Sequence, residues 1–535
     1  MSADPAPATA DVALDQLFGP PGDADLECKC ATPDATCAAP EHGALAPSSP
    51  PDSPPSHSNS PRAKPASACR GFLSFFGVTW LVSSAYIDPG SIQGDLSQGA
   101  YTGYCLLWVT FWATVVGYAF QTLAARIGVV TGNDLAANIR ATHPSRELHC
   151  TIWLFMELAA VGCDIQALIG SAFALNMLFG LAFWAGCLVT TAGCLLITVV
   201  YHLRSSLVES FVGGCVTVLV VCYVVQAGIS APPAGPIFVG WIAPTSPAYA
   251  KLVAIGTIGA LIMPNAVFLH SSLVVARRTD RGDVRAVADA NRYSALENAV
   301  GMGMSFVANL CIVCVFAAFF SPDCAAQGLA AVAGGGCGNI GLNDVGDTLA
   351  SLWGPASRYV FAVGLYLSGV ASVISSTLCS QVIMEGFTRI KMGFGRRMLL
   401  TRALALAPTL ALCLVYGTDA ATLSVMNEWI NISMSFFLPF AIVPALQISR
   451  NQKLMGAFAT GPKCAALLWA IVAIVMGINA YLVVVFIYYP DVMGSVGAFP
   501  DSPLFYTCVG AGFVIYLYCS YVLLCSGRAC RRNRG

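Results

Sequence analysis

Charged residues are scarce in this sequence, and their scarcity argues against a soluble fold. Only 10% of the 535 residues are Asp, Glu, Lys or Arg, whereas a soluble globular protein carries roughly 25%. Hydrophobic residues make up 56% of the chain, and its mean hydropathy is +0.70. The sequence also contains no basic block with interleaved aromatic residues, so we expect no nucleic-acid partner. The composition indicates a polytopic, all-α membrane protein.

We also expect no cleavable signal peptide, because no basic N-terminal segment is followed by a short apolar one. Residues 1–68 are rich in Pro, Ala, Ser and Asp, which predicts a disordered cytoplasmic tail. Cys28, Cys30 and Cys37 lie in this tail without partner histidines, so an unstructured segment is favoured over a zinc site.

Residues 69–527 are expected to form one transmembrane domain of about twelve helices. Twelve apolar segments are each long enough to span about 30 Å of hydrocarbon. They cover residues 71–94, 100–125, 149–175, 177–201, 207–228, 251–276, 293–320, 356–386, 398–417, 424–448, 464–488 and 503–526. A short basic cytoplasmic tail, 528–535, follows them.

The distribution of Lys and Arg predicts the orientation of these segments. If the N-terminus is cytoplasmic, every Lys and Arg except Lys251 and Arg358 falls on the cytoplasmic side. We therefore expect both termini in the cytoplasm, with the protein in a plasma membrane or an endosomal or vacuolar membrane. In the outer loop 321–350, an oxidising compartment would allow a disulfide between Cys324 and Cys337.

The stretch 83–98 interrupts the first apolar segment. Asp88 lies deep in the run, and Pro89 and Gly90, the two strongest helix breakers, follow it directly. A carboxylate at bilayer depth is costly and usually marks a substrate or ion pathway. A broken helix at that depth is tolerated only where it is packed in protein or lines a watery cavity. The alternative for Asp88 is a helix-end carboxylate at the membrane interface.

A second break lies in segment 251–276, where Pro264 falls in the middle of the span between Met263 and Asn265. Five spans (71–228) begin with the first break, and five (251–448) begin with the second. Because five is odd, the two halves must have opposite orientations in the membrane. Paired broken helices in inverted repeats are typical of a secondary transporter with a binding site at the midplane.

The residues at the two breaks favour a cation as the ligand. Unwound turns expose carbonyl oxygens, and Asp88 adds a negative charge. Met263 adds a soft thioether, which suits transition metals better than calcium or magnesium. The alternative for Met263 is a flexible filler of the core.

Specific motifs occur in order along residues 70–490. They are AYIDPG at 85–90, LAARIGVVTG at 123–132, ELA and CDIQ at 157–159 and 163–166, ALIMP and FLHS at 260–264 and 268–271, VIMEGF at 382–387, and LPFA at 438–441. In these motifs the chain resembles the natural resistance-associated macrophage protein (NRAMP) family of proton-coupled divalent-metal transporters. The resemblance implies a LeuT-like fold of two inverted five-helix repeats, with two extra C-terminal helices at 464–526.

The resemblance also implies a ligand set for the metal. Asp88, the Met263 sulfur and the carbonyls of Ala85 and Ala260 would hold the ion. The family's Asn after the first break is Ser91 here, which keeps an oxygen but loses reach. A family Gln near the metal corresponds to Asn431 here.

The family's proton route is altered in this chain. The family has His where this chain has Asn265, and Glu where it has Ala167, and neither replacement titrates near neutral pH. Two interpretations stay open. Asn265 could compensate for the amide lost at Ser91, or the chain is a changed paralogue with altered metal choice and weakened coupling.

Other residues could still carry protons. Asp88 itself can hold one, and Asp164 with Arg397 or Arg402 could form a relay out of the site. That pair could equally be a structural salt bridge. His270 is either functional or a hydrogen-bonded structural residue.

These patterns predict a secondary transporter of manganese or ferrous iron that works by alternating access and is coupled to protons. We expect no enzyme activity and no resident cofactor, since the metal ion and proton are substrates. The partners we expect are divalent metal ions, protons and the lipid bilayer. The alternatives are an NRAMP-like paralogue with altered selectivity or without proton coupling, a non-transporting metal sensor, and a carrier of small organic substrates.

Overall fold

The computed structural model describes eleven ranges of the chain. They are residues 86–143, 145–203, 205–247, 250–277, 279–325, 330–332, 336–338, 341–388, 394–416, 420–488 and 516–524. The two predicted tails, 1–68 and 528–535, and the predicted ligand Ala85 lie outside the described residues.

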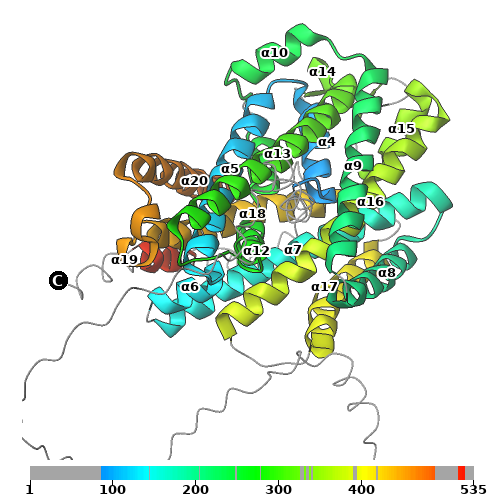
Figure 1. The fold of residues 1–535 in the computed structure, drawn as a ribbon. Helices are drawn as coiled ribbons and strands as arrows, with labels where there is room; N and C mark the ends of the chain where they lie inside the picture. Colours follow the sequence, from blue (N-terminus) through cyan, green and yellow to red (C-terminus); the bar gives the residue numbers. More distant parts are fainter. Residues whose placement is uncertain are drawn as a thin grey trace, which may run out of the picture.

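The described chain is almost entirely helical (Figure 1). The first repeat contains α4 (Pro89–Thr102), α5 (Leu107–Thr131), α6 (Leu135–Thr142), α7 (Arg146–Phe179), α8 (Phe183–Leu203), α9 (Ser205–Ser230) and α10 (Ala234–Ile242). The second contains α11 (Lys251–Leu261), α12 (Pro264–Val275), α13 (Val284–Phe316), η2 (Ala317–Phe319), α14 (Pro322–Ala325), α15 (Leu342–Trp353), α16 (Pro355–Thr388), α17 (Phe394–Tyr416) and α18 (Ala420–Ser449). After it come α19 (Gln452–Met455), η3 (Gly456–Phe458), α20 (Pro462–Tyr488) and a helix at 516–524.

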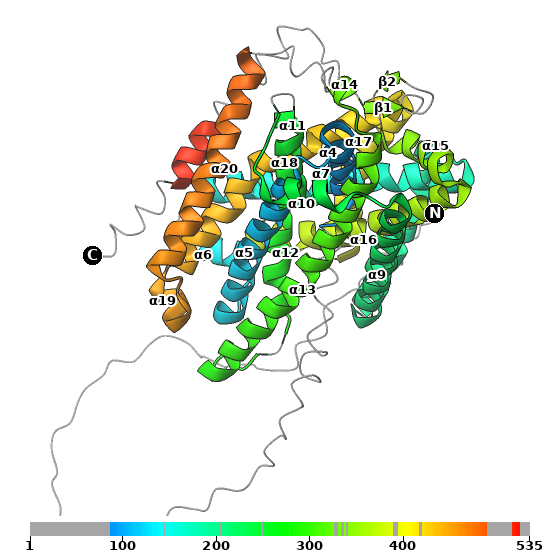
Figure 2. The same ribbon diagram turned by 90° about the horizontal axis from the view of Figure 1, so that it is seen from above.

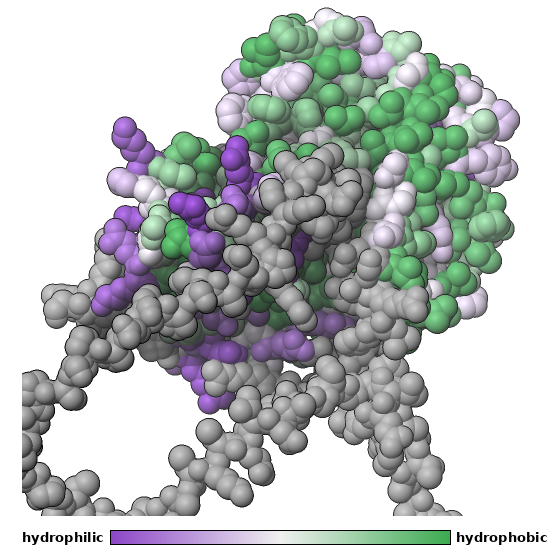
Figure 3. All heavy atoms as spheres, viewed as in Figure 1, coloured by the Kyte–Doolittle hydropathy of each residue, from purple (hydrophilic) through white to green (hydrophobic). Residues whose placement is uncertain are grey.

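Nine helical stretches within the described ranges are long and apolar enough to cross a membrane, and α11 with α12 forms one of them. The predicted first, ninth and twelfth spans are represented by α4, the shorter apolar α17 and the helix at 516–524. Figure 3 shows apolar side chains over α8 and α9, whereas hydrophilic ones gather at the lower end of the same view. This surface fits a protein that lies within a bilayer.

The predicted boundary between the first two spans was wrong. The first span was expected to end at 94 and the second to begin at 100, but α4 continues to Thr102 and α5 begins at Leu107. Because Asp95 and Gln98 are polar, the hydropathy pattern did not predict that α4 continues through them. In the structure almost every residue of this helix is buried by neighbouring helices. Gly103, at φ 60, then ends it.

The outer loop 321–350 contains structure that the hydropathy pattern did not reveal. The strands β1 (Ala330–Val332) and β2 (Gly336–Gly338) pair antiparallel, and α14 packs against both. Cys324 on α14 is disulfide-bonded. Its predicted partner, Cys337, lies on β2, but the Cys337 side chain is outside the described residues.

Helices of each half pack against helices of the other half. α4 of the first span packs against α13 of the seventh, and α12 of the sixth packs against α5 of the second. Likewise α9 packs against α16, and α18 packs against α7. Each contact has a counterpart five spans away, as two inverted five-helix repeats require. The predicted LeuT-like fold is therefore confirmed.

The two broken spans lie at the centre of this arrangement. α4 contacts α7, α11, α13, α16 and α18, whereas α12 contacts α5, α7, α16 and α18. Figures 1 and 2 place α20 and the helix at 516–524 together at one edge of the bundle. The repeats therefore enclose the breaks, and the extra helices stay outside.

Candidate metal site

The first break presents a buried carboxylate at the start of α4. Asp88 is the N-cap of this helix, and its Oδ1 accepts the backbone N–H of Ser91 at 2.7 Å. This hydrogen bond fixes the side chain, as in other Asp caps. Asp88 is fully buried, and its Oδ2 has no hydrogen-bond partner among the described residues. A buried carboxylate oxygen without a partner is costly, so a cation or a proton would stabilise this position.

Neighbouring helices bind the backbone carbonyls of the break. Ser368 of α16 donates to the Ile87 carbonyl, and Asn309 of α13 donates to the Tyr86 carbonyl at 3.5 Å. The Ser91 hydroxyl donates to the Asp88 carbonyl at 2.8 Å. The predicted ligand Ser91 is thus beside Asp88, but its hydroxyl proton is bound to a carbonyl of the same helical turn. These contacts hold the unwound segment without continuous helical hydrogen bonds.

The second break frees the carbonyl of Ala260. In a continuous helix the N–H of residue 264 would bond this carbonyl, but Pro264 has no N–H. The same relation holds between Ala85 and Pro89 in the first break. Ala260 and Met263 are both buried, at 1% exposure each. The Ala260 Cβ lies close to Gly94 of α4, which brings the end of α11 against the first break.

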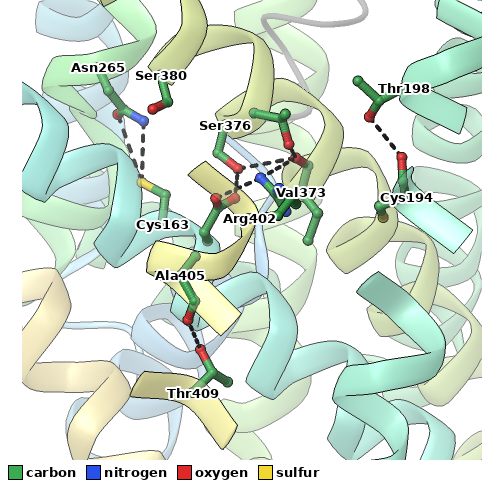
Figure 4. Close-up of polar contacts among 12 residues, drawn as sticks. Cys163, Cys194, Thr198, Asn265, Val373, Ser376, Ser380, Arg402, Ala405 and Thr409 are labelled. Atoms are coloured by element: carbon green, nitrogen blue, oxygen red, sulfur yellow. Dashed lines mark hydrogen bonds and ion pairs between the residues drawn. The ribbon is translucent and has the colours of Figure 1, made fainter. Parts of the chain in front are cut away.

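Sulfur atoms gather beside the second break. The Sδ of Met263 lies 3.9 Å from the Sγ of Cys163 on α7. The Asn265 amide lies on the other side of Cys163, with Nδ2 at 3.5 Å and Oδ1 at 3.8 Å from its Sγ (Figure 4). Cys379 on α16 donates to the Asn265 carbonyl at 2.9 Å. The predicted residues Met263 and Asn265 therefore both contact the thiol of Cys163, which the predicted site did not include.

Asn431 joins three helices at the first break. Its Nδ2 donates to the Gly90 carbonyl at 2.8 Å, and its Oδ1 accepts Gln166 Nε2 at 2.7 Å. In this conformation the amide holds α4, α7 and α18 together, and its oxygen is already bound. The backbones also approach closely here, because a Cβ on Gly170 would collide with Pro89.

Asp164 and Arg402 form the predicted ion pair. Arg402 Nη2 lies 2.6 Å from Asp164 Oδ2, and both side chains are buried. Ser376 of α16 donates to Asp164 Oδ1. Earlier on α7, Glu157 accepts a hydrogen bond from Ser380 of α16. Two carboxylates of α7, Asp164 and Glu157, therefore accept hydrogen bonds from hydroxyls of α16. These pairs are next in sequence to the thiols Cys163 and Cys379.

Two other predicted residues are His270 and Arg397. His270 is buried on α12, and its Nδ1 has no partner among the described residues. Arg397 lies on α17, but its side chain is outside the described residues. Among the described side chains, Arg402 is the arginine that contacts Asp164.

A second polar cluster lies further along α4 and was missed. Ser97 accepts from Gln93 Nε2 at 3.3 Å and donates to Glu428 of α18. Asp95 is buried, within electrostatic reach of both Asp88 and Glu428. Glu428 falls inside the apolar segment 424–448, where any ionisable residue is a candidate functional residue, so that signal could have identified it. Asp95 falls between two expected spans and carries no such signal.

No three His, Cys, Asp or Glu side chains come together as a metal site within the described ranges. An ion at the breaks would therefore need donors of other kinds. Asp88 supplies one carboxylate, Met263 a thioether, and Ala260 a carbonyl. This mixture of one charge with soft and neutral donors would be compatible with a divalent transition metal.

Comparison with known proteins identifies the family. The family model described as "Natural resistance-associated macrophage protein-like" matches residues 79–485. The chain belongs to this family. It is 34% identical over 449 residues to Metal transporter Nramp3 of Arabidopsis thaliana, covering 83% of this chain and 85% of that protein. It is also 34% identical over 416 residues to Metal transporter nramp1 homolog of Dictyostelium discoideum, covering 77% and 75%.

Two solved structures have the same fold. The Eremococcus coleocola manganese transporter, solved in complex with an aromatic bis-isothiourea substituted compound, matches with a TM-score of 0.74 at 24% identity, covering 87% of this chain and 97% of that one. Mhp1, a nucleobase-cation-symport-1 family transporter, matches with a TM-score of 0.50 at 12% identity, covering 72% and 81%. This NRAMP chain is an integral membrane protein.

Proposed function

We propose that this chain is a secondary transporter of divalent transition-metal ions. The observation that carries the proposal is the meeting of two broken helices at the centre of the bundle. One break presents Asp88 Oδ2, which has no partner within the described part of the chain, and the other presents Met263 and the freed carbonyl of Ala260. Relatives named as metal transporters support the assignment.

Transport would proceed by alternating access around these breaks. α4 and α12 each pack against helices of the opposite repeat. A movement of one repeat against the other would therefore change access to Asp88 from either side while the ligands stay together. The positions of Lys and Arg support cytoplasmic termini. The membrane would be a plasma membrane or an endosomal or vacuolar membrane.

Manganese and ferrous iron are the leading substrates. The Met263 thioether favours them over magnesium, which prefers oxygen ligands and gives up its water reluctantly. The test is uptake of Mn²⁺ and Mg²⁺ by the purified protein in liposomes. We expect Mn²⁺ uptake to exceed Mg²⁺ uptake, and equal uptake would remove the argument from Met263.

Proton coupling is the second part of the proposal. Asp88 would bind a proton in place of the metal, and the ion pair of Asp164 with Arg402, with the Ser376 hydroxyl on Asp164, would accept it next. We expect the lumen of the vesicle to acidify as metal enters. Metal uptake without acidification would favour the alternative, a paralogue that has lost proton coupling. Ala167 and Asn265 motivate this alternative because they replace titratable residues of the family.

A further inference from the structure

Cys163 is a buried thiol whose position suggests more than packing. It lies on α7, 2% exposed, and its Sγ contacts both Met263 and Asn265, the residues on either side of Pro264. Asp88 is close enough for its charge to act on the same thiol. Cys163 therefore lies beside the second break.

The separation of the two sulfurs fits a shared metal. Two sulfur ligands at about 2.3 Å from one tetrahedral ion lie about 3.8 Å apart. The Met263 Sδ and Cys163 Sγ are 3.9 Å apart. Asn265 Nδ2, at 3.5 Å, donates to Cys163 and holds its sulfur in place, and Cys379 in turn donates to the Asn265 carbonyl. The pair thus needs little rearrangement to bind one ion.

Asp88 would supply an oxygen donor to the same ion. Asp88 Oδ2 is fully buried and has no hydrogen-bond partner among the described residues. Together with the Ala260 carbonyl, the donors would be two sulfurs and two oxygens. A second sulfur beside Met263 suits thiophilic, zinc-like ions better than manganese, which takes mostly oxygen donors.

We propose that Cys163 is a second sulfur ligand of the transported ion and shifts the selectivity of this chain toward thiophilic divalent metals such as Cd²⁺ and Zn²⁺. This inference rests on the proposed function, because it assigns a ligand to the same site. The competing explanation is that the two sulfurs are only in van der Waals contact.

X-ray absorption of the purified, Cd²⁺-loaded full chain decides between them by counting the sulfur atoms bound to the metal. We expect two sulfur neighbours in the wild type and one in Cys163→Ser. Cys215→Ser, which changes another buried thiol on α9, should keep two. One sulfur neighbour in the wild type would overturn the inference, and this result does not depend on how well any variant folds.

Competition in liposomes gives a second readout. The preference for Cd²⁺ over Mn²⁺ should fall about tenfold or more in Cys163→Ser, since loss of groups that support a metal costs about 10–100-fold in affinity. Cys215→Ser should keep the wild-type preference. An unchanged preference in Cys163→Ser would contradict the inference. A chain that binds Cd²⁺ through two sulfurs but moves no metal would instead contradict the proposed function alone.

Discussion

Breaking the buried pair between Asp164 and Arg402 should strongly destabilise the protein. The side chains are 3% and 4% exposed, and Arg402 Nη2 lies 2.6 Å from Asp164 Oδ2. Removing one partner leaves a buried charge without compensation, which costs about 3–5 kcal/mol. We expect a loss of this size in Asp164→Leu and in Arg402→Met, measured by reversible SDS unfolding in mixed micelles.

The double variant Asp164→Leu/Arg402→Met provides the control. Replacing both charges by apolar groups is often neutral or stabilising, so most of the lost stability should return. Ser376 then keeps its bond to the Val373 carbonyl at 3.3 Å. If each single variant is as stable as the wild type, the buried pair is refuted. If the stable double variant still acidifies the lumen during metal uptake, the pair is structural and not a proton relay.

The remaining predictions concern packing and pH. Gly170→Ala should lower the free energy of unfolding by about 1–3 kcal/mol because the new Cβ collides with Pro89. Gly193→Ala, with open space around it, should be neutral or stabilising. Equal unfolding free energies for the two variants would contradict the close approach of Gly170 to Pro89. Asp134, outside the membrane spans, caps α6 through the Ala137 N–H at 2.7 Å, and its burial raises its pKa. The folded state therefore keeps this proton to higher pH than the unfolded chain, so this group's contribution to stability falls as pH rises above about 4. Asp134→Asn should keep the cap and remove that slope in unfolding measured against pH, and an unchanged slope would disprove the assignment.

The fold was largely predictable from sequence because its main signals are local. Apolar length, Pro and Gly breaks and the positions of Lys and Arg each act within one span. The α4 boundary was not predictable in this way, since Asp95 and Gln98 are polar and become buried only through contacts with other helices. The strands β1 and β2 are three residues each and carry too little pattern to detect.

The site was predictable in part. Asp88, Met263 and Pro264 violate the rules for a membrane helix, so their sequence context marks them. Cys163 violates none, because a thiol in an apolar helix resembles any other buried residue. Its role depends on a distance between α7 and the second break, and only the three-dimensional structure supplies that distance. The same reason explains why Arg402 rather than Arg397 could not be selected in advance.

The most direct test of the central claim is metal uptake by the wild type, Asp88→Ala and Met263→Ala with several metals in competition. The proposed site predicts that Asp88→Ala abolishes uptake, because it removes the only charge at the two breaks among the described residues. Met263→Ala should retain uptake but lose discrimination against magnesium and calcium. Unimpaired uptake of manganese by Asp88→Ala would contradict the account.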